Sequence, residues 1–223
     1  MSIGRPSSRS TAIERSERDA VARSAPQWRS ANAVIALLVT GLSLLAAAPF
    51  ALPDSYGYSW VEQGTSESAA QGIDGAWVAR LGFLTLGLAV LLLASLRARA
   101  WRPVGTVLHL AFGTGMIAGA AYSTKPWWEG AAYVESEDLL HSVCATVVGI
   151  GFVGGVLAVM VARRLPSAAA ATPDLLAIAI TTTMPLMMSA GIWGVLQRMM
   201  FLTAAIWYGR EAWSAHSTGR PST

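Results

Sequence analysis

The sequence predicts an all-α protein, a polytopic membrane bundle of six transmembrane helices with both termini in the cytoplasm. Three observations lead to this fold class. Apolar residues make up 53% of the chain and charged residues only 13%, whereas charged residues make up about 25% of a typical soluble domain. Long apolar runs recur along the chain, each near the ~20 residues that a helix needs to cross a bilayer. Arginines gather at the ends of alternate runs, as in the cytoplasmic loops of membrane proteins.

The six predicted spans follow one another along the chain. In order they are residues 31–52, 76–96, 103–121, 139–162, 174–192 and 195–213. With both termini inside, 13 of the 16 basic residues lie on the cytoplasmic side. Those residues are Arg5, Arg9, Arg15, Arg18, Arg23, Arg29, Arg97, Arg99, Arg102, Arg163, Arg164, Arg210 and Arg220. The basic residues left on the outer side in this topology are Arg80, Lys125 and Arg198. The excess of basic residues on the cytoplasmic side sets the predicted orientation.

The spans form one domain, residues 31–213, between two cytoplasmic tails. Residues 1–30 are rich in Ser, Arg and Ala and lack apolar periodicity, so we expect a disordered tail. A signal peptide is the alternative, but the apolar run 31–52 is too long for its hydrophobic region. Residues 214–223 form the second tail. The Arg-rich, Lys-poor composition is typical of a GC-rich bacterium, which predicts a multi-pass protein of the bacterial inner membrane.

Composition also bounds the chemistry and the partners. Cys144 is the single cysteine, so the chain has no internal disulfide and no cysteine metal cluster. His109 and His141 differ in predicted depth by roughly 15 Å, and His216 lies in the tail, so we expect no zinc site and no cofactor. The basic excess lies where anionic headgroups attract it. We therefore expect membrane lipids as partners, with possible protein partners within the membrane and no nucleic acid.

The two outer connections, residues 53–75 and 122–138, are longer and more polar than the inner ones. We therefore expect any localised function on the outer face. Within the first of them, the segment from Thr65 to Gly72 is too polar for a span. It is either a surface loop or, as we favour, a short helix that enters the mouth of the bundle, where protein or water satisfies its backbone.

A possible acid–base device opens the fourth span. Asp138 is three residues before His141, and Glu137 is four residues before it, so either carboxylate can orient the imidazole on one helix face. Glu67 could meet this pair from the first outer loop. His141, Asp138 and Glu67 are therefore the candidate catalytic residues. An inert structural histidine is the alternative for His141.

Ionisable residues near other span ends extend this set. Arg80 and Arg198 open their spans on the outer side, and such residues are costly in lipid unless they face the protein interior or water. Either arginine could bind a phosphate or carboxylate in a bidentate manner, or could pair with Glu67 to lock the loop to a helix. The candidate ligand-binding residues are Ser66, Glu67, Arg80, His141 and Arg198.

Two small-residue motifs predict close helix packing. They join Gly115 to Gly119 and Gly151 to Gly155, and such faces let two helices approach closely. Their predicted depths differ by roughly 15 Å, so the two motifs cannot pack against each other. Packing within the bundle and an oligomer face are both open.

Several segments together resemble a known membrane family. They are YSWVEQGTSESAAQG, which ends at Gly72, WVARLGF from Trp77, ESEDLLHS from Glu135, and GVLQR, which ends at Arg198. Over roughly residues 31–213 the chain resembles the bacterial and archaeal family known as domain of unknown function 998. This resemblance implies a six-helix membrane protein with marked polar positions at Ser66, Glu67, Arg80, His141 and Arg198. It implies no particular activity.

These observations predict an integral membrane protein whose outer polar pocket binds a lipid headgroup or a small amphiphile. One alternative is an enzyme of lipid or cell-envelope metabolism, with His141 as general base. Another is a non-catalytic accessory subunit of a larger membrane complex. A transporter has less support, because the chain shows no internal repeat.

Overall fold

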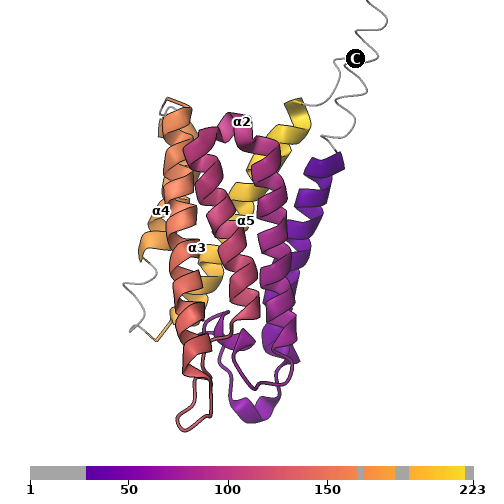
Figure 1. Ribbon diagram of the computed structural model, residues 1–223, viewed down its shortest axis with the longest axis vertical. Helices are drawn as coiled ribbons and strands as arrows, with labels where there is room; N and C mark the ends of the chain where they lie inside the picture. The colour runs from indigo at the N-terminus through magenta and orange to yellow at the C-terminus, as the bar shows by residue number, and fades with distance from the viewer. Residues whose placement is uncertain (1–28, 165–167, 184–190, 219–223) are drawn as a thin grey trace, which may run out of the picture.

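The computed structural model describes residues 29–164, 168–183 and 191–218, and this part of the chain consists of helices and connecting loops, without strands. An N-terminal helix spans Arg29–Ala51 and ends in the 3-10 turn η1, Ala48–Ala51. The helices that follow are α2 (Trp77–Ala121), α3 (Glu135–Ala162), α4 (Ala168–Thr183) and α5 (Trp193–Thr218). Figure 1 shows them running side by side along the long axis as a bundle. The predicted all-α class is confirmed.

Helix α2 turns back on itself at Arg102. This residue has φ 60° and ψ 168°, outside the helical region. It precedes Pro103, and a residue before proline is pushed away from helical geometry, whereas proline fits the first turn of a new helix. The halves 77–101 and 103–121 then run side by side, with the turn at the top of Figure 1. They touch where an added Cβ on Gly87 would lie 2.7 Å from the carbonyl oxygen of Gly113.

Three described helices are long and apolar enough to cross a membrane: Arg29–Ala51, α2 and α3. These helices make the chain a membrane protein. The two halves of α2 correspond to the predicted spans 76–96 and 103–121, and they are two helices that meet directly at Arg102. The predicted link 97–102 is helical up to Trp101, because its Ala and Arg residues favour helix. The number of six spans remains a prediction.

The remaining boundaries differ modestly from the prediction. Helix α3 begins at Glu135, before the predicted 139, because three acidic residues stabilise its first turn. Helix α4 begins at Ala168 and is described to Thr183. Helix α5 continues to Thr218, into the predicted tail 214–223. The predicted tail 1–30 lies outside the described residues, apart from Arg29 and Ser30 at the start of the first helix.

The glycines of α3 pack it against the second half of α2. An added Cβ on Gly151 would lie 2.8 Å from the carbonyl oxygen of Leu108, and one on Gly155 would lie 2.6 Å from the ring of His109. Gly115 of α2 instead faces Val148. The two small-residue motifs thus meet different partners, as their different depths predict. Their close-packed glycines are used within the bundle.

A buried ion-pair cluster holds the helices together at the end of the bundle that carries the Arg102 turn. Glu211 of α5 is 1% exposed, and its two carboxylate oxygens lie 3.2 Å from Arg97 of α2 and 2.6 Å from Arg163 of α3. The indole Nε1–H of Trp101 donates to the same carboxylate at 2.9 Å. One carboxylate therefore ties together α2, α3 and α5.

A second carboxylate at the same end ties α4 to α5. Asp174 is 1% exposed, pairs with Arg210, and accepts a hydrogen bond from Trp207 Nε1 at 2.8 Å. From the sequence, the links at this end were expected only to be shorter and less polar than the other connections. In the structure, Arg97 and Arg163 beside these links and Arg210 of α5 form the ion pairs that join the helices.

Candidate functional site

A large cavity opens at the opposite end of the bundle, where the two long loops lie. Its volume is about 1040 Å³, and it is lined by residues of η3 (Glu67–Ala69), of both halves of α2 and the loop that follows α2, and of α3, α4 and α5. Helices α3 and α5 are held together at the turn end by Arg163 and Glu211. Between their other ends lies the cavity, with residues of both helices on its walls.

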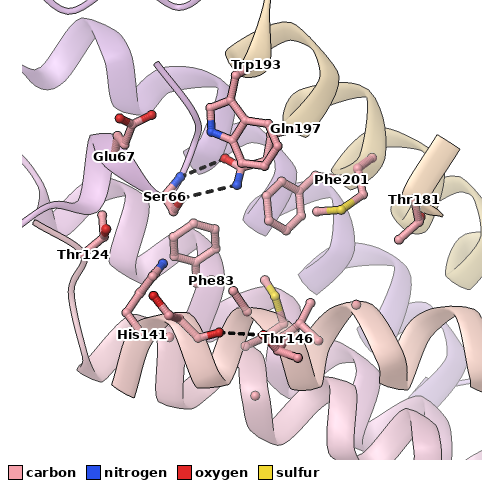
Figure 2. A pocket seen from close by; sticks show the side chains of 18 of the residues that line it. Ser66, Glu67, Phe83, Thr124, His141, Thr146, Thr181, Trp193, Gln197 and Phe201 are labelled. Carbon is pink, nitrogen blue, oxygen red and sulfur yellow. Dashed lines mark hydrogen bonds between the residues drawn. The ribbon is translucent and has the colours of Figure 1, made fainter. Parts of the chain in front are cut away.

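The cavity has a polar mouth and an apolar interior. Figure 2 shows Ser66 and Gln197 on one side of the mouth, Thr124 and His141 on the other, and Phe201 and Thr181 farther along. The apolar walls are formed by Phe83, Met116, Val148, Val153, Met200 and Phe201. Such a division between polar and apolar walls suits an amphiphile, with its head at the mouth and its tail inside.

Gln197 and Ser66 form a reciprocal pair at the mouth. The backbone N–H of Ser66 donates to Gln197 Oε1 at 3.1 Å, and Gln197 Nε2 donates to Ser66 Oγ at 3.2 Å. These bonds fix η3 of the first loop on α5, as Figure 2 shows. The expected short helix between Thr65 and Gly72 is therefore a single 3-10 turn, with Ser68 and Ala69 fully buried.

His141 lines the cavity, and one of its two ring nitrogens is hydrogen-bonded to the protein backbone. Its Nδ1 lies 2.9 Å from the carbonyl oxygen of Tyr122. A carbonyl oxygen only accepts, so Nδ1 carries the proton, and Nε2 of the neutral ring is an acceptor. The side chain is 8% exposed, and Nε2 makes no hydrogen bond within the described part of the chain. A ligand in the cavity is the partner within its reach.

The two carboxylates expected to orient His141 instead bind the start of the second loop. Asp138 Oδ1 accepts from Thr124 Oγ1 at 2.9 Å and from the backbone N–H of Lys125 at 2.8 Å. Glu137 Oε1 accepts from the backbone N–H of Ser123 at 2.7 Å. Both acidic groups therefore bind the start of the second loop. The expected role of Asp138 and Glu137 beside the imidazole was wrong, because the backbone N–H groups of Ser123 and Lys125, which follow the end of α2, bind these carboxylates instead.

Arg198 is also committed to the loops. Its Nη1 lies 2.7–3.0 Å from three carbonyl oxygens, those of Trp60, Gln63 and Gly194. Its Nη2 donates to the hydroxyl of Tyr58 at 2.6 Å. The guanidinium does not line the cavity. Arg198 therefore fixes the first loop on α5 instead of facing a ligand.

Arg80 has a similar position. Its Nε and Nη2 donate to the carbonyl oxygens of Ala69 and Ala70, each at 3.2 Å. These carbonyls end the 3-10 turn η3, and Arg80 does not line the cavity. Arg80 and Arg198 thus shape the loop that forms the mouth. Five polar positions were expected to meet at one ligand, and the structure brings three of them, Ser66, Glu67 and His141, to the cavity wall.

Glu67 lines the cavity without an ion pair. Its Oε2 accepts from the backbone N–H of Gly64, and Figure 2 shows the carboxylate directed away from His141. The described ion pairs lie at the other end of the bundle, and none involves Glu67. The expected neutralisation of an arginine by direct contact was therefore wrong. Burial raises the pKa of Glu67, while the Gly64 hydrogen bond and the Arg198 charge lower it in part.

Replacing Glu67 by Gln is expected to raise thermal stability at pH 7 relative to the wild type. A raised folded-state pKa means that the folded protein holds this proton more tightly than the unfolded chain, so stability is complete below the ordinary pKa of 4.5 and falls as pH rises through the folded value. Gln stays neutral and still accepts from Gly64. Melting temperatures measured from pH 4 to pH 8 test this. A wild type more stable than Glu67→Gln at pH 7 would show that the ionised form is favoured.

Three glutamine and tyrosine residues that build the site were not singled out from the sequence. Gln71 joins the two loops, donating to the carbonyl oxygen of Ser123 at 2.9 Å and accepting from the backbone N–H of Val134 at 2.7 Å. Tyr58 donates to the Gly64 carbonyl at 2.9 Å, and burial raises its phenol pKa, which keeps that donor proton. With Gln197, these residues all lie inside the segments that carry the family resemblance. Their position in these segments was the signal by which the sequence could have identified them as site residues.

The other buried histidine is part of the packed core. His109 Nδ1 lies 3.0 Å from the hydroxyl of Tyr208, and its ring packs against the rings of Trp101 and Trp207. Within the described residues, no three His, Cys, Asp or Glu side chains are grouped to hold a metal ion. The residues that face the cavity therefore offer hydrogen bonds and apolar contacts.

Comparison with known proteins gives one family. A family model described as "Protein of unknown function (DUF998)" matches residues 38–214. No curated protein and no solved structure matches the chain. The matched range includes both loops, the cavity and the ion-pair cluster.

Proposed function

Because this chain belongs to the DUF998 family, whose description assigns no activity, we propose a function from the site itself. The protein binds a single-chain or similarly slender amphiphile in its cavity, with the tail between α3 and α5 and the head at the loop end. The observation that supports this proposal most strongly is that one cavity has both a polar mouth and an apolar interior. The proposal refines the expected headgroup pocket, because the tail has a site as well as the head.

The size and lining of the cavity support this. About 1040 Å³ is at the upper end of ligand pockets, which run from about 300 to 1,000 Å³. The head would contact His141, Ser66 and Gln197, while Arg80 and Arg198 act through the loop that they hold. Methionines at positions 116 and 200 suit a tail of variable shape, since Met side chains adapt to irregular contacts.

Mass spectrometry of lipids that co-purify with the protein tests the proposal. Gly149 lines the cavity, and an added Cβ there meets nothing within 4 Å, so Gly149→Phe fills the cavity without a backbone clash. We expect this variant to lose most of the retained amphiphile. Val143→Phe is the matched control, because Val143 is 52% exposed on the same helix and does not line the cavity. Equal lipid retention in both variants and the wild type would contradict the proposal.

The proposed topology is six spans in the bacterial inner membrane, with the cavity end outside and the ion-pair end inside. It is supported by the basic residues around the Arg102 turn, since basic residues favour the cytoplasmic side. The expected result is that, in a Cys144→Ala background, Glu129→Cys reacts with an impermeant maleimide in intact cells and Ala100→Cys does not. Both positions are exposed. Labelling of position 100 alone would invert the topology.

A second candidate function, a lipid-modifying enzyme, is favoured by one observation. His141 has Nδ1 on a backbone carbonyl and a free Nε2 in a cavity wall, which is the arrangement of a general base. Release of fatty acid from ester-linked lipids by purified wild type, and its loss in His141→Ala, would support this candidate. Absence of release in the wild type would leave the protein as a binder.

A further inference from the structure

We infer that the cavity selects amphiphiles with an uncharged head that donates a hydrogen bond, such as a hydroxyl or an amide, over anionic lipids. This inference rests on the proposed function and names the class of ligand. It departs from the sequence-based expectation of a phosphate or carboxylate held by arginines. Three features of the mouth carry it.

The first feature is a hydrogen-bond acceptor in the cavity wall, Nε2 of His141, that has no donor from the described part of the protein. His141 is 8% exposed, lines the cavity, and uses its Nδ1–H on the carbonyl oxygen of Tyr122. Nε2 of the neutral ring can only accept, and it has no partner within the described chain. Nε2 is open to the cavity, and a ligand that displaces water from it without donating a hydrogen bond leaves an unsatisfied acceptor, which is unfavourable. A hydroxyl or amide N–H of the ligand satisfies it, whereas a phosphate dianion or a carboxylate offers only acceptors.

The second feature is the absence of an available arginine at the described mouth. Arg198 lies against three backbone carbonyls and Tyr58, and Arg80 lies against two carbonyls. Neither lines the cavity. The formal charges that do line it are those of Lys125 and Glu67, and they are opposite. Lys125 is exposed, with its ammonium 6.0 Å from the centre of the Tyr133 ring. An anionic head therefore meets no net positive charge.

The third feature is a neutral pair of hydrogen-bonding groups opposite His141. Gln197 Nε2 donates to Ser66 Oγ and has a second N–H, and the Ser66 hydroxyl keeps its own proton. These groups can donate to a hydroxyl, ester or amide oxygen. A head that both donates and accepts satisfies the two sides of the mouth at once. Monoacylglycerols and fatty amides have this character.

Competition in native mass spectrometry tests the inference on the full-length protein in detergent. The probes share one oleoyl chain and are mixed in equal amounts: monooleoylglycerol, oleoyl lysophosphatidic acid and methyl oleate. We expect bound monooleoylglycerol to exceed methyl oleate by about 3- to 10-fold, the effect of one hydrogen bond of ordinary strength. Monooleoylglycerol should also exceed lysophosphatidic acid, which keeps one glycerol hydroxyl but carries a charged phosphate, so this second ratio reports the charge. Methyl oleate lacks a donor, so it reports the hydrogen bond apart from the charge.

Variants assign the preference to the mouth. His141→Ala should bring the ratio of monooleoylglycerol to methyl oleate close to 1 while an acyl chain is still bound. His109→Gln is the matched control, because His109 is buried in the core and does not line the cavity, so the ratio should be unchanged. The wild-type ratios test the inference even if a variant fails to fold.

The outcomes separate the two proposals. Preference for lysophosphatidic acid, or equal binding of all three probes in the wild type, would overturn the neutral-donor inference while leaving amphiphile binding in place. Binding that Gly149→Phe does not reduce, or no binding of any probe, would overturn the proposed function itself. A ratio that favours monooleoylglycerol and depends on His141 supports both.

Discussion

Replacing Glu211 by Gln is expected to lower the free energy of unfolding by about 3–5 kcal/mol, the usual cost of removing one partner from a buried ion pair. The carboxylate is 1% exposed and serves Arg97 and Arg163, whose side chains are 14% and 33% exposed. Gln can still accept from Trp101, but it leaves both guanidinium groups without a counter-charge. Helices α2, α3 and α5 would then lose the group that joins them at one end.

Unfolding by sodium dodecyl sulfate in mixed micelles measures this effect. Glu62→Gln is the control, because Glu62 is an exposed carboxylate of the loop before α2 and forms none of the described ion pairs. Its substitution should change stability by no more than about 0.5 kcal/mol. If Glu211→Gln unfolds at the same detergent fraction as the wild type, the ion-pair cluster does not stabilise the bundle.

Replacing Gly151 by Ala is expected to cost about 1–3 kcal/mol, as for other overpacked cores. The new Cβ would lie 2.8 Å from the carbonyl oxygen of Leu108 and 2.9 Å from the backbone nitrogen of Phe112. Both are backbone atoms, so α3 and the second half of α2 must move apart. The same unfolding titration reports the loss.

Gly149→Ala is the matched control for this position. It makes the same chemical change two residues away on α3, where the added Cβ meets nothing within 4 Å. Alanine favours a helix over glycine by up to about 1 kcal/mol, so this variant should be as stable as the wild type or more so. Equal effects of the two substitutions would show that close packing at Gly151 does not hold the helices together.

Much of the fold could be predicted because lipid limits what a span can be. Long apolar runs and the position of Pro103 mark the helices and the turn of α2, since a membrane leaves few alternatives to helix. The close contact of Gly151 with Leu108 could not be predicted, because a small-residue motif does not name the helix that it faces. The partners of Glu211 also come from α2 and α3, far away in sequence.

The site was predicted less well, and the arginines show why. Sequence analysis treated Arg80 and Arg198 as charges that seek an anion. In the structure they bind backbone carbonyls of an irregular loop, and nothing in the residue type tells which oxygens a guanidinium will reach. Similarly, the sequence spacing suggested a contact between Asp138 and His141. In the structure Asp138 instead accepts a hydrogen bond from the backbone N–H of Lys125 in the second loop. His141 was singled out because it opens a predicted span next to a polar loop, and in the structure it lines the cavity.

The most direct test of the central claim is to locate the acyl chain of a bound amphiphile. Monooleoylglycerol with a diazirine in its tail would be bound to the protein, photolysed, and the labelled residues identified by mass spectrometry. Labels at Met116, Val153, Met200 and Phe201, lost in Gly149→Phe, are the predicted result. Labels confined to exposed positions outside the cavity, such as Leu157 and Val161, and unchanged in Gly149→Phe, would contradict the account.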